Sequence, residues 1–218
     1  MRSIRIVGLV ICFTAALAAC SKDPTSGVSP ARVGESGEAS TPSTSTGKLK
    51  PAQESIALVG DIVFVGSKVS GIHECRFSDW KGTFWPADEK VEFSIQTASV
   101  VADYKDPRPW SSKLARHLKG ADFFDSEQFP TATFVSRSIK KSSELGPGVT
   151  HQVTGALTIR GVTREVSFPA SIESKQGTVS ASAEFSINRK DFNVVYPGKP
   201  DDLIRDGVTL KLALRGQR

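Results

Sequence analysis

Residues 153–168 read VTGALTIRGVTREVSF and carry the pattern that decides the fold class. Val153, Leu157 and Ile159 are apolar and alternate with polar residues. Such alternation is typical of a β-strand that buries one face. Gly161 separates this run from the next, and glycine suits the positive φ of a tight hairpin turn. The stretch therefore predicts two antiparallel strands joined by a short turn.

The same alternation recurs on both sides of this hairpin. Further alternating runs lie at 91–96, 166–173, 179–187 and 208–215. Less regular strand patterns cover 56–69, 72–84 and 131–140, so that we expect about eight strands. Antiparallel sheets commonly bury one face and leave the other in water. About eight such strands in a meander fit a closed barrel, and we predict an all-β fold of that kind.

One short helix interrupts the strand patterns. We expect it over 107–119, where Trp110, Leu114 and Leu118 recur four residues apart and form one apolar stripe. Asp106 precedes this segment and is a residue type that caps helices. A single helix among many strands suggests a plug at one end of the barrel.

The amino-terminal residues resemble a bacterial lipoprotein leader. Residues 1–19 combine Arg2 and Arg5 with an apolar run that is shorter than the roughly 20 residues of a bilayer span. The run ends in Leu-Ala-Ala before Cys20, which resembles the motif at which lipoprotein precursors are cut and the cysteine is acylated. We expect residues 1–19 to be a signal peptide and Cys20 to carry lipid.

Residues 20–54 have the composition of a tether. They are rich in Ser, Thr, Gly and Pro and lack aromatic residues, so they bury too little apolar surface to offset the entropy of ordering. We expect a disordered tether there, followed by one domain over 55–218. Without residues 1–19 the chain has 26 Lys+Arg and 23 Asp+Glu, a net charge of +3, which is too weak to indicate nucleic-acid binding.

No complete catalytic or metal-binding motif is evident in the sequence. His73 and Glu74 begin like the zinc motif HExxH, but Phe77 occupies the position of the second histidine. Cys75 is the cysteine that remains after Cys12 leaves and Cys20 is acylated, so no disulfide framework is expected. We therefore expect neither an enzyme nor a bound metal, and no cofactor.

Three stretches together resemble the YceI-like family of periplasmic lipid-binding β-barrels. They are HLKGADFFDSEQFPTATFVS (117–136), VTGALTIRGVTREVSF (153–168) and FSINRKDFNVVYP (185–197). The resemblance extends over the whole domain and implies a lipocalin-like antiparallel barrel with a long apolar pocket. It also implies a polyisoprenoid ligand, such as the tail of an isoprenoid quinone, and no catalysis.

The resemblance and the alternation together indicate candidate site residues. The residues expected to line the lipid pocket are Phe93, Ile95, Phe123, Phe124, Phe134, Leu157, Ile159, Phe168 and Phe185. The candidates for contact with a polar head group are Arg160, Asn188 and Asp191. Asn188 and Asp191 are also residue types that cap a short helical turn.

The sequence leaves other interpretations open. The favoured interpretation is a lipid-anchored binding protein in the bacterial envelope, which faces the periplasm and lies at the outer rather than the inner membrane. Alternatively, side chains fill the barrel and the domain docks on a protein partner that the sequence does not indicate. An enzyme or metal protein that uses His73, Cys75 or His117 is the least supported interpretation.

Overall fold

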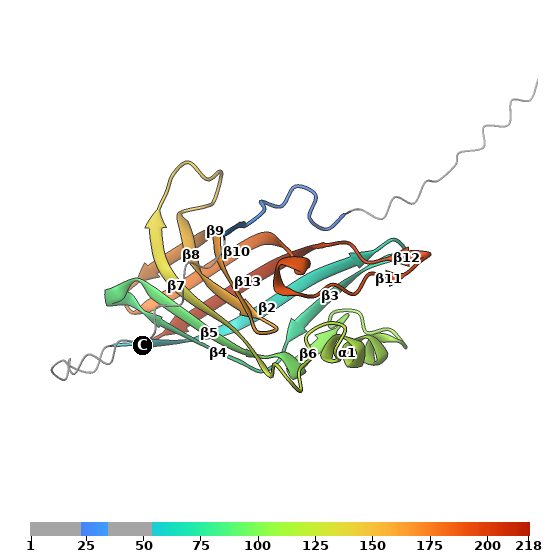
Figure 1. Cartoon of the computed structure of the whole chain (residues 1–218). Coiled ribbons are helices and arrows are strands. Elements are labelled where there is room, and N and C mark those ends of the chain that lie inside the picture. Colours follow the sequence, from blue (N-terminus) through green and yellow to red (C-terminus); the bar gives the residue numbers. More distant parts are fainter. Residues whose placement is uncertain (1–22, 35–53) are drawn as a thin grey trace, which may run out of the picture.

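A computed structural model describes residues 23–34 and 54–218 of the chain. Figure 1 shows a long, tilted barrel of antiparallel strands with one helix beside one end. The barrel strands are β2 (Ile56–Lys68), β4 (Trp80–Trp85), β5 (Lys90–Gln96), β7 (Thr131–Lys141), β8 (His151–Ile159), β9 (Val162–Lys175), β10 (Thr178–Asn188) and β13 (Gly207–Gln217). They follow the order β13-β10-β9-β8-β7-β5-β4-β2, and pairing of β13 with β2 closes the ring. The predicted all-β barrel of about eight strands is confirmed.

Shorter elements complete the fold. The remaining strands are β1 (Arg32–Gly34), β3 (Gly71–Phe77), β6 (Val100–Ala102), β11 (Gly198–Lys199) and β12 (Asp202–Leu203). The helical elements are α1 (Ser111–Lys119) and the 3-10 turns η1 (Pro86–Asp88), η2 (Thr97–Ser99) and η3 (Arg189–Phe192). In the part of the chain that the structure describes, no helix is long and apolar enough to cross a bilayer.

The β8–β9 hairpin forms as the alternation predicts. Ile159 pairs with Val162, and the two turn residues, Arg160 and Gly161, both have positive φ, of 49° and 72°. Such values belong to the tight turns whose twist matches that of the flanking strands. Val153 and Leu157 point into the core, so the hairpin buries the face that the sequence pattern indicates.

The expected strand over 72–84 is in fact two strands with different neighbours. β3 pairs with the second half of β2, and β4 pairs with the first half. Ser78 and Asp79 form the bend between them. A single straight strand over 72–84 could not pair with both halves of β2. The sequence of β2 gives no sign that its two halves pair with different strands.

The helix is shorter than its apolar stripe predicts. It begins at Ser111, and its N-cap residue is Trp110 rather than Asp106. Trp110 is 52% exposed, so it does not belong to the buried stripe. Two prolines, Pro107 and Pro109, precede the helix, and the residue before a proline disfavours the helical conformation. The described helix packs against β6 at one end of the barrel.

The tether prediction does not hold for residues 23–34, which we call the N-terminal strap. Within the strap, β1 pairs with β9 in antiparallel register, and Figure 1 shows this blue segment beside β9. Partner strands far along the chain order the strap, although its composition is poor in apolar residues. The structure does not describe the predicted signal peptide or Cys20. Of the remaining predicted tether it describes Glu54 only.

Candidate functional site

The half of the barrel nearest α1 encloses an apolar cavity of about 180 Å³, which we call the larger cavity. Its walls come from barrel strands, from α1 and the loop that follows it, and from η3 and the segment before β13. Leu118, on the helix, closes part of one end. Sequence alternation explains these walls, because every second residue of each barrel strand must face inward.

All nine residues predicted to line a pocket line the larger cavity. They are Phe93, Ile95, Phe123, Phe124, Phe134, Leu157, Ile159, Phe168 and Phe185. Contact of these side chains with a lipid stays a prediction. Phe129, from the same phenylalanine-rich stretch as Phe123, does not line the cavity and instead packs against Gly161.

Other lining residues lacked a clear signal in the sequence. Phe192 is fully buried but lies in η3, where no alternation marks it. Phe64 and Phe77 come from β2 and β3, and both contact the ring of Phe124 with centroid distances of 5.7 and 5.6 Å. Ring pairs at such distances favour tilted or edge-on geometry, and this cluster fixes the end of the larger cavity near α1.

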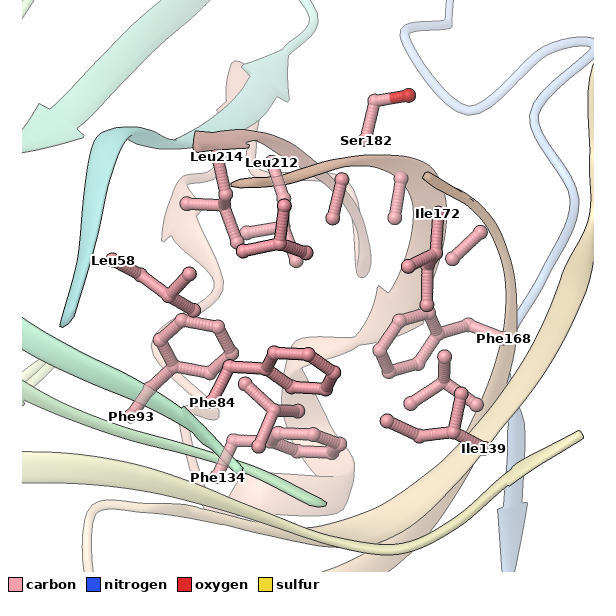
Figure 2. Close-up of a pocket in the computed structure, with 16 residues that line it drawn as sticks. Leu58, Phe84, Phe93, Phe134, Ile139, Phe168, Ile172, Ser182, Leu212 and Leu214 are labelled. Atoms are coloured by element: carbon pink, nitrogen blue, oxygen red, sulfur yellow. The ribbon is translucent and has the colours of Figure 1, made fainter. Parts of the chain in front are cut away.

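A second, smaller cavity of about 60 Å³ lies in the other half of the barrel (Figure 2). Its labelled lining residues are apolar except Ser182, whose hydroxyl points away from the cavity. Four residues border both cavities, namely Phe93, Phe134, Phe168 and Leu212. We call these four residues the waist. The barrel interior is therefore apolar along its length and divided by side chains rather than by backbone.

Two arginines bring charge to the wall of the larger cavity. Arg189 is 6% exposed and donates to the carbonyl oxygens of Val194 and Arg205 and to the carboxylate of Asp206, at 2.7, 3.1 and 3.0 Å. Arg205 is less buried, and its Nη1 lies 3.3 Å from Oδ2 of Asp23 on the strap. A buried charge needs such partners to offset its lost hydration, and here they also hold η3 against the segment before β13.

The three predicted head-group residues do not line the larger cavity. Arg160 donates to the carbonyl oxygens of Asn193 and Ala121 at 2.6 and 2.7 Å, so it joins two loops. Asn188 accepts a hydrogen bond from the backbone N–H of Lys190 and caps η3. Asp191 lies in the first turn of η3. The residue type of Asn188 therefore correctly indicates a cap of η3. The arginines that do line the larger cavity are Arg189 and Arg205.

His73, Asp103 and Ser111 form a polar cluster outside the cavity. Nδ1 of His73 lies 3.0 Å from Asp103 Oδ1, and the hydroxyl of Ser111 donates to Asp103 Oδ2 at 2.8 Å. A nucleophilic triad needs the histidine next to the serine, whereas here the aspartate lies between them. The cluster therefore anchors the start of α1 to β3.

Cys75 lies close to this cluster and is buried, with 1% of its surface exposed. Burial in a poorly solvated site raises the pKa of the Cys75 thiol to about 12, with a smaller contribution from the Asp103 charge. A thiol with so high a pKa stays protonated and is a poor nucleophile and metal ligand. Among residues 23–34 and 54–218, no group of three or more potential ligands could hold a metal.

Comparisons with known proteins agree with this fold. The model of the YceI-like domain matches residues 48–215. A UPF0312 protein of Pseudomonas fluorescens (strain SBW25) is 32% identical over 181 residues, which cover 77% of this chain and 89% of the relative. Protein YceI of Escherichia coli O157:H7 is 35% identical over 129 residues, which cover 54% of this chain and 61% of the relative.

Two solved structures have the same architecture. Burkholderia cenocepacia BcnA is 26% identical with a TM-score of 0.57, and the match covers 71% of this chain and 94% of BcnA. A polyisoprenoid binding domain from Saccharophagus degradans has the same TM-score of 0.57 at 14% identity, covering 74% of this chain and 97% of that domain. The second likeness is one of fold alone.

Proposed function

Since the chain belongs to the YceI-like family, we propose that it is a non-catalytic binding protein for a polyisoprenoid or a similar long-chain amphiphile. The observation that carries the proposal is the larger cavity, whose wall is apolar apart from Arg189 and Arg205. The structural neighbour from Saccharophagus degradans is described as a polyisoprenoid binding domain, which supports the same class of ligand.

The energetics of burial favour an apolar chain. An isoprene unit offers on the order of 100 Å² of apolar surface, and at roughly 25 cal/mol per Å² its burial contributes about 2.5 kcal/mol before the costs of association. A few units therefore suffice for tight binding without any catalytic group. The alternative of a barrel filled by its own side chains fits less well with a cavity of about 180 Å³.

The volume of the larger cavity bears on how long a lipid chain it can hold. An engineered cavity of about 150 Å³ stays dry and binds benzene, and the larger cavity at about 180 Å³ exceeds it. A longer chain needs the waist side chains to turn aside and join the two cavities. Phe134 and Phe168 lie in contact at the waist, with ring centroids 5.7 Å apart, and we expect these two rings to turn aside when a longer chain binds.

The polar head of the amphiphile fits best near Arg205. This arginine lines the larger cavity and is also partly exposed, so it can meet both a buried chain and a solvated head. A guanidinium group suits phosphate, carboxylate or quinone oxygens as acceptors. Arg160, Asn188 and Asp191 remain weaker candidates, because internal hydrogen bonds occupy Arg160 and Asn188.

The leader-like residues support an envelope location as part of the proposal. Cleavage after Ala19 and acylation of Cys20 would anchor the protein to a bacterial membrane, with its barrel in the periplasm and the outer membrane as the favoured site. Growth with labelled palmitate tests this directly. Label on the protein that is lost in Cys20→Ala supports the anchor, and an unlabelled parent protein contradicts it.

The proposed ligand class is tested by native mass spectrometry. Residues 21–218, which contain every described residue, are secreted into a bacterial periplasm, purified and weighed. We expect a stoichiometric adduct that solvent extraction identifies as a polyprenyl or quinone species. A bare protein that stays bare after addition of an octaprenyl lipid or ubiquinone would overturn the proposal and favour an interaction module.

A further inference from the structure

The N-terminal strap closes a gap between β9 and β10. These two strands pair from Thr178 and Lys175 as far as Ser182 and Ser171. Beyond that point β9 takes β1 as its partner on this edge, with Arg32 opposite Ser167. On the β10 side, backbone hydrogen bonds of 2.8 and 3.1 Å join Ser186 to Ala31 and Ser29 of the strap. The strap thus completes the barrel wall where β9 and β10 diverge (Figure 1).

The strap lies directly over the larger cavity. Val33 is opposite Val166, which is fully buried and lines that cavity. Phe185 and Ile187, which flank the strap-bonded Ser186, line it as well. Ala31 and Val33 pack against the same hydrophobic core. If the strap moves away, the side chains of Val166, Phe185 and Ile187 are what remains to cover the cavity between β9 and β10.

The strap is held by a short strand pairing and by few large side chains. β1 pairs with β9 over three residues, whereas β10 pairs with β13 along its full eleven residues. The apolar side chains that it places on the core are small, Ala31 and Val33. Its ion pair, Asp23 with Arg205, is 40% and 39% exposed, and exposed pairs stabilise by about 1 kcal/mol or less. The hydroxyl of Thr209 also donates to the carbonyl oxygen of Pro24 at 2.9 Å. The strap can thus leave without breaking the long β10–β13 pairing.

We propose that the strap is a lateral gate for the ligand, an inference that rests on the proposed lipid-binding function. Its release opens the β9–β10 seam, so that a long chain enters sideways. The end of the barrel near α1 offers a narrower path, because the rings of His117, Phe123 and Tyr196 pack together there with centroid distances of 4.9 to 5.7 Å. Release also moves the Asp23 carboxylate away from Arg205, so that it no longer competes with the head group for this guanidinium.

A reducible lock tests the gate. Arg32 and Ser167 lie opposite each other in the β1–β9 pairing, so the double variant R32C/S167C places a disulfide between the strap and β9. Arg32 is exposed, and the hydroxyl of Ser167 forms hydrogen bonds with the side chains of Gln152 and Thr154. The control, S180C/R215C, joins a regular pair of β10 and β13. Association and dissociation of the fluorescent lipid cis-parinaric acid are followed by stopped flow. We expect oxidation of the first pair to slow both rates at least about tenfold, with the dissociation constant nearly unchanged.

Equal rates in the oxidised and reduced R32C/S167C protein, with the control also unaffected, would overturn the gate.

If the parent protein binds no cis-parinaric acid, octaprenyl lipid or quinone, the proposed function fails, and the gate is then tested without ligand. Ile187→Cys places a thiol at the seam in a residue that is 6% exposed. We expect Val33→Asp to speed maleimide labelling of this thiol at least about tenfold, because a carboxylate packed against the apolar core loses hydration and favours release of the strap. An unchanged labelling rate would overturn the gate.

Discussion

The ring of Phe129 lies so close to Gly161 that a β-carbon on Gly161 would stand 2.6 Å from Phe129 Cε1. This contact joins the loop before β7 to the β8–β9 turn, two stretches that the family resemblance also brings together. Gly161 has a φ of 72°, which is strained for any residue with a β-carbon. Both the contact and the conformation therefore demand glycine.

We predict that Gly161→Ala destabilises the protein by about 2–4 kcal/mol, from backbone strain of about 1–2 kcal/mol and from overpacking. The control is Gly148→Ala, where φ is 77° and no atom lies within 4 Å of the new β-carbon. It should cost only the strain, about 1–2 kcal/mol. Urea unfolding of both variants measures the difference. Equal losses would show that the Phe129 contact adds nothing.

Partly filling the larger cavity should weaken ligand binding. Ala132 lines only the larger cavity and Ala170 only the smaller one, and both are 5% exposed. Either leucine substitution should cost about 1–3 kcal/mol through overpacking. We predict that Ala132→Leu weakens cis-parinaric acid binding at least about tenfold, whereas Ala170→Leu weakens it less. The reverse order, measured by fluorescence titration, would place the ligand in the smaller cavity.

The buried guanidinium of Arg189 should be hard to replace. Lysine cannot reproduce the fork that reaches Val194, Arg205 and Asp206 at once. We predict that Arg189→Lys costs about 1–3 kcal/mol, because lysine keeps the charge but leaves buried acceptors without a donor. Lys190→Ala removes an exposed pair with the same Asp206 and should cost about 1 kcal/mol or less. Similar losses for the two variants in thermal unfolding would contradict this assignment.

Cys75 should make stability fall at high pH. Burial raises the pKa of its thiol from 9.0 to about 12, so the unfolded chain loses this proton first. The folded state then binds more protons, and stability declines with rising pH between about 9 and about 12, by up to ~1.4 kcal/mol per pH unit. Cys75→Ala removes this contribution while other titrating groups stay the same. Parallel stability curves for the two proteins from pH 8 to pH 11 would contradict the shift.

Sequence pattern predicted the barrel and most of the cavity wall because both depend on local alternation. Leu157 and Ile159 alternate with polar residues along one strand. The apolar face of that strand points into the barrel, whichever strand lies beside it. Phe192 was missed because a 3-10 turn has no such period. Arg189 was missed because its partners lie in a segment that no motif links to it, and a buried arginine is uncommon.

The strap could not be predicted for a different reason. Its order comes from partners far along the chain, such as Arg205, which is 182 positions from Asp23, and Ser186. Its own residues bury little apolar surface, so composition alone indicates disorder. The division of 72–84 into β3 and β4 is a similar case, because the partner strand β2 decides where each half pairs.

The position of Asp23 also sets how far the barrel can stand from an anchor at Cys20. Asp23 lies three positions after Cys20, and a segment of that length spans at most about 11 Å. With the strap docked, an acylated Cys20 would therefore hold the Arg205 end of the barrel close to the lipid surface. With the strap released, a flexible tether from Cys20 to Ile56, as the composition predicts, would reach roughly 30 Å on average. The same movement that opens the seam would thus let the barrel stand further from a membrane to which Cys20 is anchored.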